Sequence, residues 1–238
     1  MSIPRFYCPQ IQGDSLQLDE SESHHALHVL RLKSNDAIEV FDGAGRVAQA
    51  IIAEAGRRTV RCDIRELQTH EPPQRPKLTV AAAAPRGDRL RSLVEKLTEL
   101  GVDHYVPLRT ARSVADPGGG RIERLQATVI AAMKQSGRNH LMQVDAVTDL
   151  SAVLRNATSD KQRLLIAHPD AASQEESFGV ITTNTLLLIG PEGGFTAEEV
   201  LRASDCEAER IAWTGGILRI ETAAVVFSAL TLHRMSNC

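Results

Sequence analysis

The sequence lacks the features that mark membrane, secreted and metal-binding proteins. No apolar run approaches the roughly 20 residues that a membrane-spanning helix needs, and the N-terminus has no apolar stretch typical of a secretory signal. The four cysteines, Cys8, Cys62, Cys206 and Cys238, show no CxxC spacing, so we expect reduced thiols in a cytoplasmic protein. His24, His25 and His28 lack cysteine or carboxylate neighbours at a metal-binding spacing, so we expect no metal site. Internal repeats and low-complexity tracts are absent as well.

The composition is that of a globular protein, but the charges are unevenly distributed. The 238 residues are 42% hydrophobic and 24% charged, which suits one large domain or two ordinary ones. Residues 1–71 hold 8 Lys/Arg and 11 Asp/Glu, residues 75–138 hold 12 and 6, and residues 139–238 hold 7 and 13. The basic middle section suits a polyanion such as RNA, although solvated helix faces are the commoner cause of such a pattern.

Proline-rich sequence predicts a linker at residues 72–77 between two domains. In residues 1–71, short strand-like runs separated by turn signals predict a small β-barrel. These runs are residues 37–43, 46–54 and 58–67. A short helix is expected from Glu22 to Leu30, capped by Ser21.

After the linker, strand-like and helix-like segments alternate, which predicts an α/β domain over residues 78–238, with helices on both faces of a sheet. Strands are expected at residues 78–84, 104–108, 163–169, 185–190 and 210–213, and helices at residues 88–101, 121–137 and 221–235. The first helix carries leucines on one face and ends at Gly101. The last helix is apolar on nearly every side, so we expect it to be buried under the sheet or in an interface.

A glycine-rich turn at residues 190–194 separates an apolar strand from a helix. It matches neither the P-loop nor the dinucleotide-binding pattern, and Thr196 and Glu199 form a capping box that occupies the first-turn amides. Glu192, Glu198 and Glu199 would repel a phosphate at this helix start. The turn therefore suits a nucleoside with a cationic group, such as S-adenosylmethionine (SAM), or else it is a tight connection without a ligand.

A second glycine-containing exit follows the strand expected at residues 210–213. Ile217 and Leu218 would provide an apolar wall for an adenine ring, and Arg219 and Glu221 flank the start of the last helix. A surface Arg–Glu pair with an ordinary helix cap would explain the same residues. Because two such exits follow C-terminal strands, we expect them to share one pocket.

These motifs resemble the RsmE family of the SPOUT superfamily, whose members methylate N3 of a uridine in 16S ribosomal RNA of the small subunit. The most specific blocks are residues 135–138, 188–196 and 217–223, with further similarity at residues 3–7, 24–36, 41–45 and 86–102. The resemblance implies a C-terminal α/β domain with a deep trefoil knot and a PUA-like N-terminal β-barrel that binds RNA. It also implies SAM as the cofactor and a cytoplasmic homodimer.

The motifs and the resemblance together predict the site. The expected cofactor-binding residues are Ala167, His168, Gly190, Pro191, Glu192, Gly193, Trp213, Ile217 and Leu218. Arg219 is the expected catalytic cation, because methylation of N3 spreads negative charge over the uracil ring. Glu192 is expected to order the substrate or the loop. His168 and Glu221 remain open as candidate bases, and the expected RNA contacts are Arg86, Gln135 and Arg138.

The sequence departs from the family pattern at two positions: Gly216 stands where the pattern has arginine, and Lys134 stands where it commonly has glutamate. Other functions remain open. They are a ribose 2′-O-methyltransferase of the same superfamily, a non-catalytic RNA-binding or ribosome-assembly module, and a phosphate-using nucleotide enzyme. The acidic turn argues against the last of these.

Overall fold

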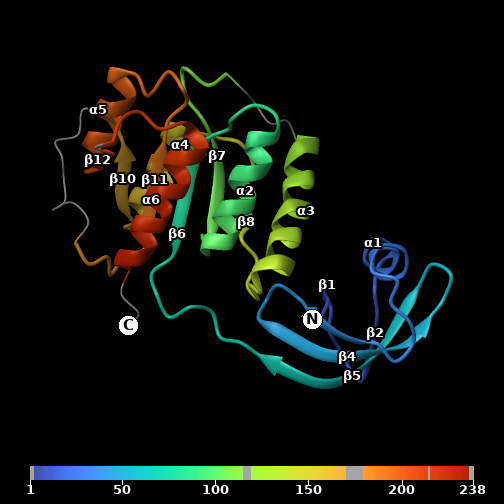
Figure 1. Cartoon of the computed structure of the whole chain (residues 1–238). Helices are drawn as coiled ribbons and strands as arrows, with labels where there is room; N and C mark the ends of the chain where they lie inside the picture. The colour runs from blue at the N-terminus through green and yellow to red at the C-terminus, as the bar shows by residue number, and fades with distance from the viewer. Residues whose placement is uncertain (1–2, 115–118, 170–178, 214, 236–238) are drawn as a thin grey trace. The chain divides into compact units, whose positions relative to one another are not determined.

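The computed structural model describes residues 3–114, 119–169, 179–213 and 215–235 (Figure 1). The chain forms two compact units. The first unit contains residues 1–73 together with residues 133–141, and the second contains residues 74–132 and 142–238.

The first unit is built on a curled five-stranded sheet with the strand order β1-β3-β4-β5-β2. Its strands are β1 (Arg5–Tyr7), β2 (Ser15–Gln17), β3 (Ala37–Phe41), β4 (Arg46–Ala55) and β5 (Val60–Thr69). β1 pairs with β3 in parallel, and the other pairs are antiparallel. Two register shifts bend the β4–β5 hairpin, which is the usual way in which a sheet curls. The strands expected at residues 37–43, 46–54 and 58–67 are confirmed, with ends that differ by a few residues.

A helical segment covers this sheet, but it begins earlier than the sequence predicts. α1 (Glu20–His24) continues directly into a π-helical turn, η1 (His25–Val29). The cap is Asp19, whose carboxylate accepts a 2.7 Å hydrogen bond from the Glu22 amide. The prediction of Ser21 as the cap was wrong, because two residues suited to capping lie close together and only the path of the backbone selects between them.

Residues 133–141 are fixed to the first unit by two cations that are largely, but not fully, buried. Arg5 donates to the Met133 carbonyl and to Asn139 Oδ1. Lys134 pairs with both carboxylate oxygens of Glu22, at 2.7 and 2.9 Å, and lies 5.3 Å from the ring centroid of Phe6. These contacts explain why a segment so distant in sequence packs with the N-terminal sheet.

The second unit is an α/β layer structure with the strand order β12-β10-β11-β6-β7-β8, and all strand pairs in it are parallel. Its strands are β6 (Leu78–Ala83), β7 (His104–Arg109), β8 (Gln143–Val144), β9 (Thr148–Asp149), β10 (Arg163–Ala167), β11 (Thr185–Ile189) and β12 (Glu209–Ile211). The central strand β11 is buried along its whole length, as its continuous apolar run predicts.

Helices cover both faces of this sheet (Figure 1). They are α2 (Asp88–Leu100), α3 (Gly119–Ser136), α4 (Leu150–Ser159), α5 (Ala197–Asp205) and α6 (Ile220–Arg234). α4 and α5 share an apolar cluster with the strands on one face, while α6 packs on α2, β6 and β11. α2 ends at Gly101, whose φ of 91° is the left-handed conformation that glycine adopts readily. The predicted α/β class is confirmed, and the trefoil knot stays a prediction.

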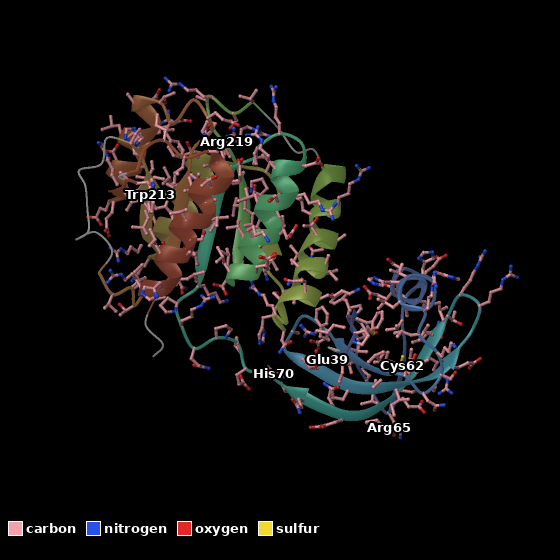
Figure 2. The ribbon with its side chains drawn as sticks, in the orientation of Figure 1. Glu39, Cys62, Arg65, His70, Trp213 and Arg219 are labelled. Atoms are coloured by element: carbon pink, nitrogen blue, oxygen red, sulfur yellow. The ribbon has the colours of Figure 1, made fainter. Side chains whose placement is uncertain are left out.

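The described cysteines are free, in agreement with the expectation of reduced thiols. Cys62 lies inside the first unit (Figure 2), where burial, with a smaller effect from Asp63, raises the pKa of its thiol to about 12. Such a thiol stays protonated and unreactive at neutral pH. Cys238 lies outside the described residues.

Candidate active site

A cavity of about 610 Å³ opens in the second unit where three parallel strands end. Its walls come from the segments that follow β10, β11 and β12 and from the first turns of α6. Ligands of open parallel sheets bind at the carboxyl ends of the strands, and this volume suits a small organic ligand. The two glycine-containing exits recognised in the sequence do share one pocket.

The structure places the predicted cofactor residues together. All nine of them line this cavity: Ala167, His168, Gly190, Pro191, Glu192, Gly193, Trp213, Ile217 and Leu218. They meet because β10 lies between β11 and β12 in the sheet, which brings the ends of the three strands side by side.

Some backbone groups in the cavity wall have no hydrogen-bond partner among the described residues. Within the described part of the chain, the backbone groups of Gly190, Ile217 and Leu218 form no hydrogen bond. Gly190 and Leu218 are half-buried, whereas Ile217 is exposed to solvent, which can satisfy its main chain. Half-buried main-chain groups normally have partners, so the unpaired groups of Gly190 and Leu218 indicate a ligand with its own donors and acceptors. Apolar surface from Ile189 and Phe227 lies in the same wall.

The turn that carries Gly190 is locked by its helix cap. Thr196 Oγ1 accepts from the Glu199 amide, and Glu199 Oε2 accepts from the Thr196 amide at 2.8 Å, so the predicted capping box is confirmed. Glu199 is buried. The helix start is therefore closed to a phosphate, both by these bonds and by the carboxylate charge.

A chain of charges borders the cavity on one side. Glu192 lines the cavity and lies 3.4 Å from Arg89 Nη2, and Arg89 Nη1 lies 3.8 Å from Glu221 Oε2. Both side chains of the first pair are about 40% exposed, so the pair contributes little to stability. In this conformation the Glu192 carboxylate lies at the cavity edge.

Arg219 is not among the residues that line the cavity. It is exposed and occupies the N-cap of α6, between the lining residues Leu218 and Ile220 (Figure 2). Its guanidinium forms no ion pair or hydrogen bond with the residues that the structure describes. The cation in the cavity wall is instead Arg112, from the segment after β7, which no pattern in the sequence indicated.

The residues expected to contact RNA lie in different units. Arg86 is exposed in the second unit, between β6 and α2. Gln135, in the last turn of α3, and Arg138 belong to the first unit, where Arg138 Nε donates to the His140 carbonyl. Among the described residues there is no cluster of histidine, cysteine and carboxylate groups able to hold a metal. No described helix is long and apolar enough to cross a membrane.

Comparison with known proteins identifies the family. A family model for an RNA methyltransferase domain matches residues 71–232, and one for an RNA methyltransferase PUA domain matches residues 18–65. A Mycobacterium bovis protein named ribosomal RNA small subunit methyltransferase E is 30% identical over 217 residues, covering 88% of this chain and 82% of the relative. This chain belongs to the methyltransferase E family.

Solved structures of two relatives were determined with SAM bound. A methyltransferase E from Neisseria gonorrhoeae superposes with a TM-score of 0.87 at 27% identity and covers 98% of each chain. A methyltransferase from Legionella pneumophila superposes with a TM-score of 0.88 at 26% identity, covering 98% of this chain and 97% of the other.

The methyltransferase E pattern has arginine where this chain has Gly216, and the backbone explains the glycine. Gly216 lines the cavity with a φ of 119°, a conformation that side-chain-bearing residues rarely adopt. An arginine here would strain this loop, although no heavy atom lies within 4 Å of the position of a Cβ. The conformation of this loop, rather than a lack of space, therefore favours glycine over arginine at position 216.

Proposed function

We propose that this protein transfers the methyl group of SAM to N3 of a uridine in 16S ribosomal RNA of the small subunit. The observation that carries the proposal is the cavity lined by half-buried, unpaired main chain at Gly190 and Leu218. Such a wall suits the hydrogen-bonding edge of adenine and its ribose, and the capped, acidic helix start excludes a triphosphate.

The residues around the cavity fit SAM chemically. Ile217 and Leu218 supply apolar surface for the adenine ring, and the main chain of Gly190 supplies a donor and an acceptor beside it. The Glu192 carboxylate provides negative charge for a sulfonium group. When bound, SAM supplies an electrophilic methyl group, so the protein needs no metal for the transfer.

The remaining task of the chain is to prepare the uracil. The N3 proton must leave, and the charge that develops over N3 and its flanking oxygens must be stabilised. We assign the second role to Arg219, whose guanidinium has no partner in the described residues and stands next to the cavity wall. Of the two candidate bases, His168 lines the cavity whereas Glu221 does not, which favours His168.

We further propose that residues 1–71 form an RNA-binding domain, that residues 72–77 form a linker, and that residues 78–238 form the methyltransferase domain. Arg86 and Arg138 would contact RNA phosphates, because cations outside the cavity are needed to hold a polyanion in the cytoplasm at physiological salt. The neutral Gln135 side chain would contact the RNA through hydrogen bonds of its amide group. A target base must be unpaired or turned out of its stack to reach a cavity of this kind.

The function is tested in two steps. SAM should bind the purified protein in calorimetry, with one molecule per chain. Digested 16S ribosomal RNA from cells that lack the gene should have lost one N3-methyluridine by mass spectrometry, and the purified protein with SAM should restore it. Loss of a ribose-methylated nucleotide would instead establish 2′-O methylation. Failure to bind SAM would point to a non-catalytic RNA-binding protein, and tight ATP binding would point to a nucleotide enzyme.

We also propose that the protein acts as a homodimer. The supporting observation is α6, where Leu230 is 38% exposed and Val225 and Val226 are half-buried although they carry no polar group. Exposed apolar side chains along a helix are typical of surfaces that bind another chain. Light scattering at micromolar concentration should give twice the chain mass, and Leu230→Asp should shift the protein toward the monomer. A wild-type monomer under these conditions would contradict the proposal.

A further inference from the structure

The segment that follows β7 reaches the glycine-rich turn of the cavity. Arg112 Nη1 donates a 2.6 Å hydrogen bond to the Gly193 carbonyl. The aliphatic part of the same side chain lies against Gly193, since a Cβ at that glycine would be 3.3 Å from Arg112 Cδ. Arg112 therefore contacts the turn with both its charged end and its stem, and it lines the cavity as well.

A second contact ties the same two segments. Glu199 Oε1 accepts a 2.8 Å hydrogen bond from the Ala111 amide, while Oε2 serves the helix cap at Thr196. Two hydrogen bonds between Thr110 and Ser113 form a turn. The Thr110 amide donates to Ser113 Oγ at 2.9 Å, and the Ser113 amide donates to the Thr110 carbonyl at 3.1 Å. Residues 110–113 thus form a compact turn that is fixed at two points, to the glycine-rich turn through Gly193 and to the helix cap that follows it through Glu199.

We propose that Arg112 is a positioning residue for SAM and that, together with Glu199, it braces the glycine-rich turn in its binding conformation. This inference rests on the proposed function. A glycine-rich backbone loses much conformational entropy when it becomes ordered. A turn that is not held in place would therefore have a lower affinity for any ligand that binds to its main chain. A charge-assisted bond to the Gly193 carbonyl imposes that order before the ligand arrives.

If Arg112 holds the glycine-rich turn in its binding conformation, replacing it should weaken SAM binding without slowing the methyl-transfer step. Arg112→Ala should weaken SAM binding in calorimetry by roughly ten- to a hundredfold, the loss that follows from removing one hydrogen bond to a charged group. The KM for SAM should rise in parallel. The single-turnover rate at saturating SAM should stay within about threefold of wild type, because Arg112 acts on the turn and not on the uracil.

Arg202→Ala is the matched control. Arg202 is exposed on α5, pairs with Glu198 and does not line the cavity, so its replacement removes the same charge and should leave SAM affinity unchanged. Arg112→Lys should recover part of the affinity, since an ammonium group can still donate to the Gly193 carbonyl.

Glu199→Gln tests the second point of attachment. The amide keeps one acceptor oxygen, so one of the two bonds to Ala111 and Thr196 is lost and SAM affinity should fall. Because both side chains join residues 110–113 to the connection between β11 and α5, the double variant with Arg112→Ala should lose less affinity than the sum of the two single losses. Unchanged SAM affinity in folded Arg112→Ala, or strictly additive losses, would overturn the brace. Failure of the wild-type protein to bind SAM would overturn the proposed function and the brace with it.

Discussion

Replacing Arg219 by alanine is expected to slow methyl transfer by roughly 10²–10³-fold, the usual loss when one donor to a developing anion is removed. SAM affinity should stay within about threefold of wild type, because the side chain does not line the cavity and only its neighbours Leu218 and Ile220 do. The folded state should be unaffected, since the exposed guanidinium forms no bond with the described residues. Single-turnover methylation of small-subunit RNA at saturating SAM measures the loss.

A matched variant separates this role from a general effect of charge on RNA binding. Arg210, on β12, is also exposed and does not line the cavity, and its one side-chain hydrogen bond to a described residue is a long one, to Ser204 Oγ at 3.4 Å. Arg210→Ala should change the single-turnover rate by less than about threefold. If Arg219→Ala instead lost SAM affinity or unfolded at a lower temperature while its saturated rate stayed normal, the assignment of Arg219 to the uracil anion would be wrong.

Lys134→Glu should lower the free energy of unfolding by about 3–5 kcal/mol, which is the cost of breaking a buried ion pair and leaving one charge uncompensated. The Lys134 and Glu22 side chains are only 16% and 11% exposed, and both carboxylate oxygens of Glu22 bond to the ammonium. The new glutamate would stand beside Glu22 with no cation between them, and the contact with the Phe6 ring would be lost. Urea denaturation followed by circular dichroism measures the change.

The charge-swapped variant provides the control for this second prediction. Glu22→Lys combined with Lys134→Glu places opposite charges together again, so it should recover much of the stability that either single change removes. Glu20→Lys is a matched change at an exposed position of the same helix and should cost less than about 1 kcal/mol. A double variant no more stable than Lys134→Glu alone would show that the ion pair is not what fixes residues 133–141.

The same ion pair accounts for one departure from the family pattern. The family pattern that the sequence resembles has glutamate where this chain has Lys134, and a glutamate there would face Glu22 in this protein. The lysine therefore compensates for a carboxylate 112 positions earlier in the chain. No residue near position 134 in the sequence indicates that Glu22 is its partner. The two residues pair only because the end of α3 packs against α1.

The sequence by itself determined the elements and the location of the pocket. Apolar runs and helical periodicity set β6, α2 and β11 to within a residue or two, because each pattern is repeated over a whole element. The glycine-rich turn and the capping box could also be predicted, because each involves only residues close together in the sequence. Thr196 and Glu199, for example, are three residues apart. The sequence also predicted that the two glycine-containing exits share one pocket, and the strand order found in the structure brings them together.

Only the tertiary structure decided which side chains complete the pocket. The sequence pointed to Arg219 because it adjoins a motif, whereas the cation in the wall is Arg112, which comes from the segment after β7 and donates to the Gly193 carbonyl. The cap at Asp19 and the pairing of Lys134 with Glu22 likewise depend on where the backbone runs. Local sequence patterns predict interactions between residues that are close together in the chain. Contacts between distant segments form only when the sheet brings those segments together, so local patterns do not predict them.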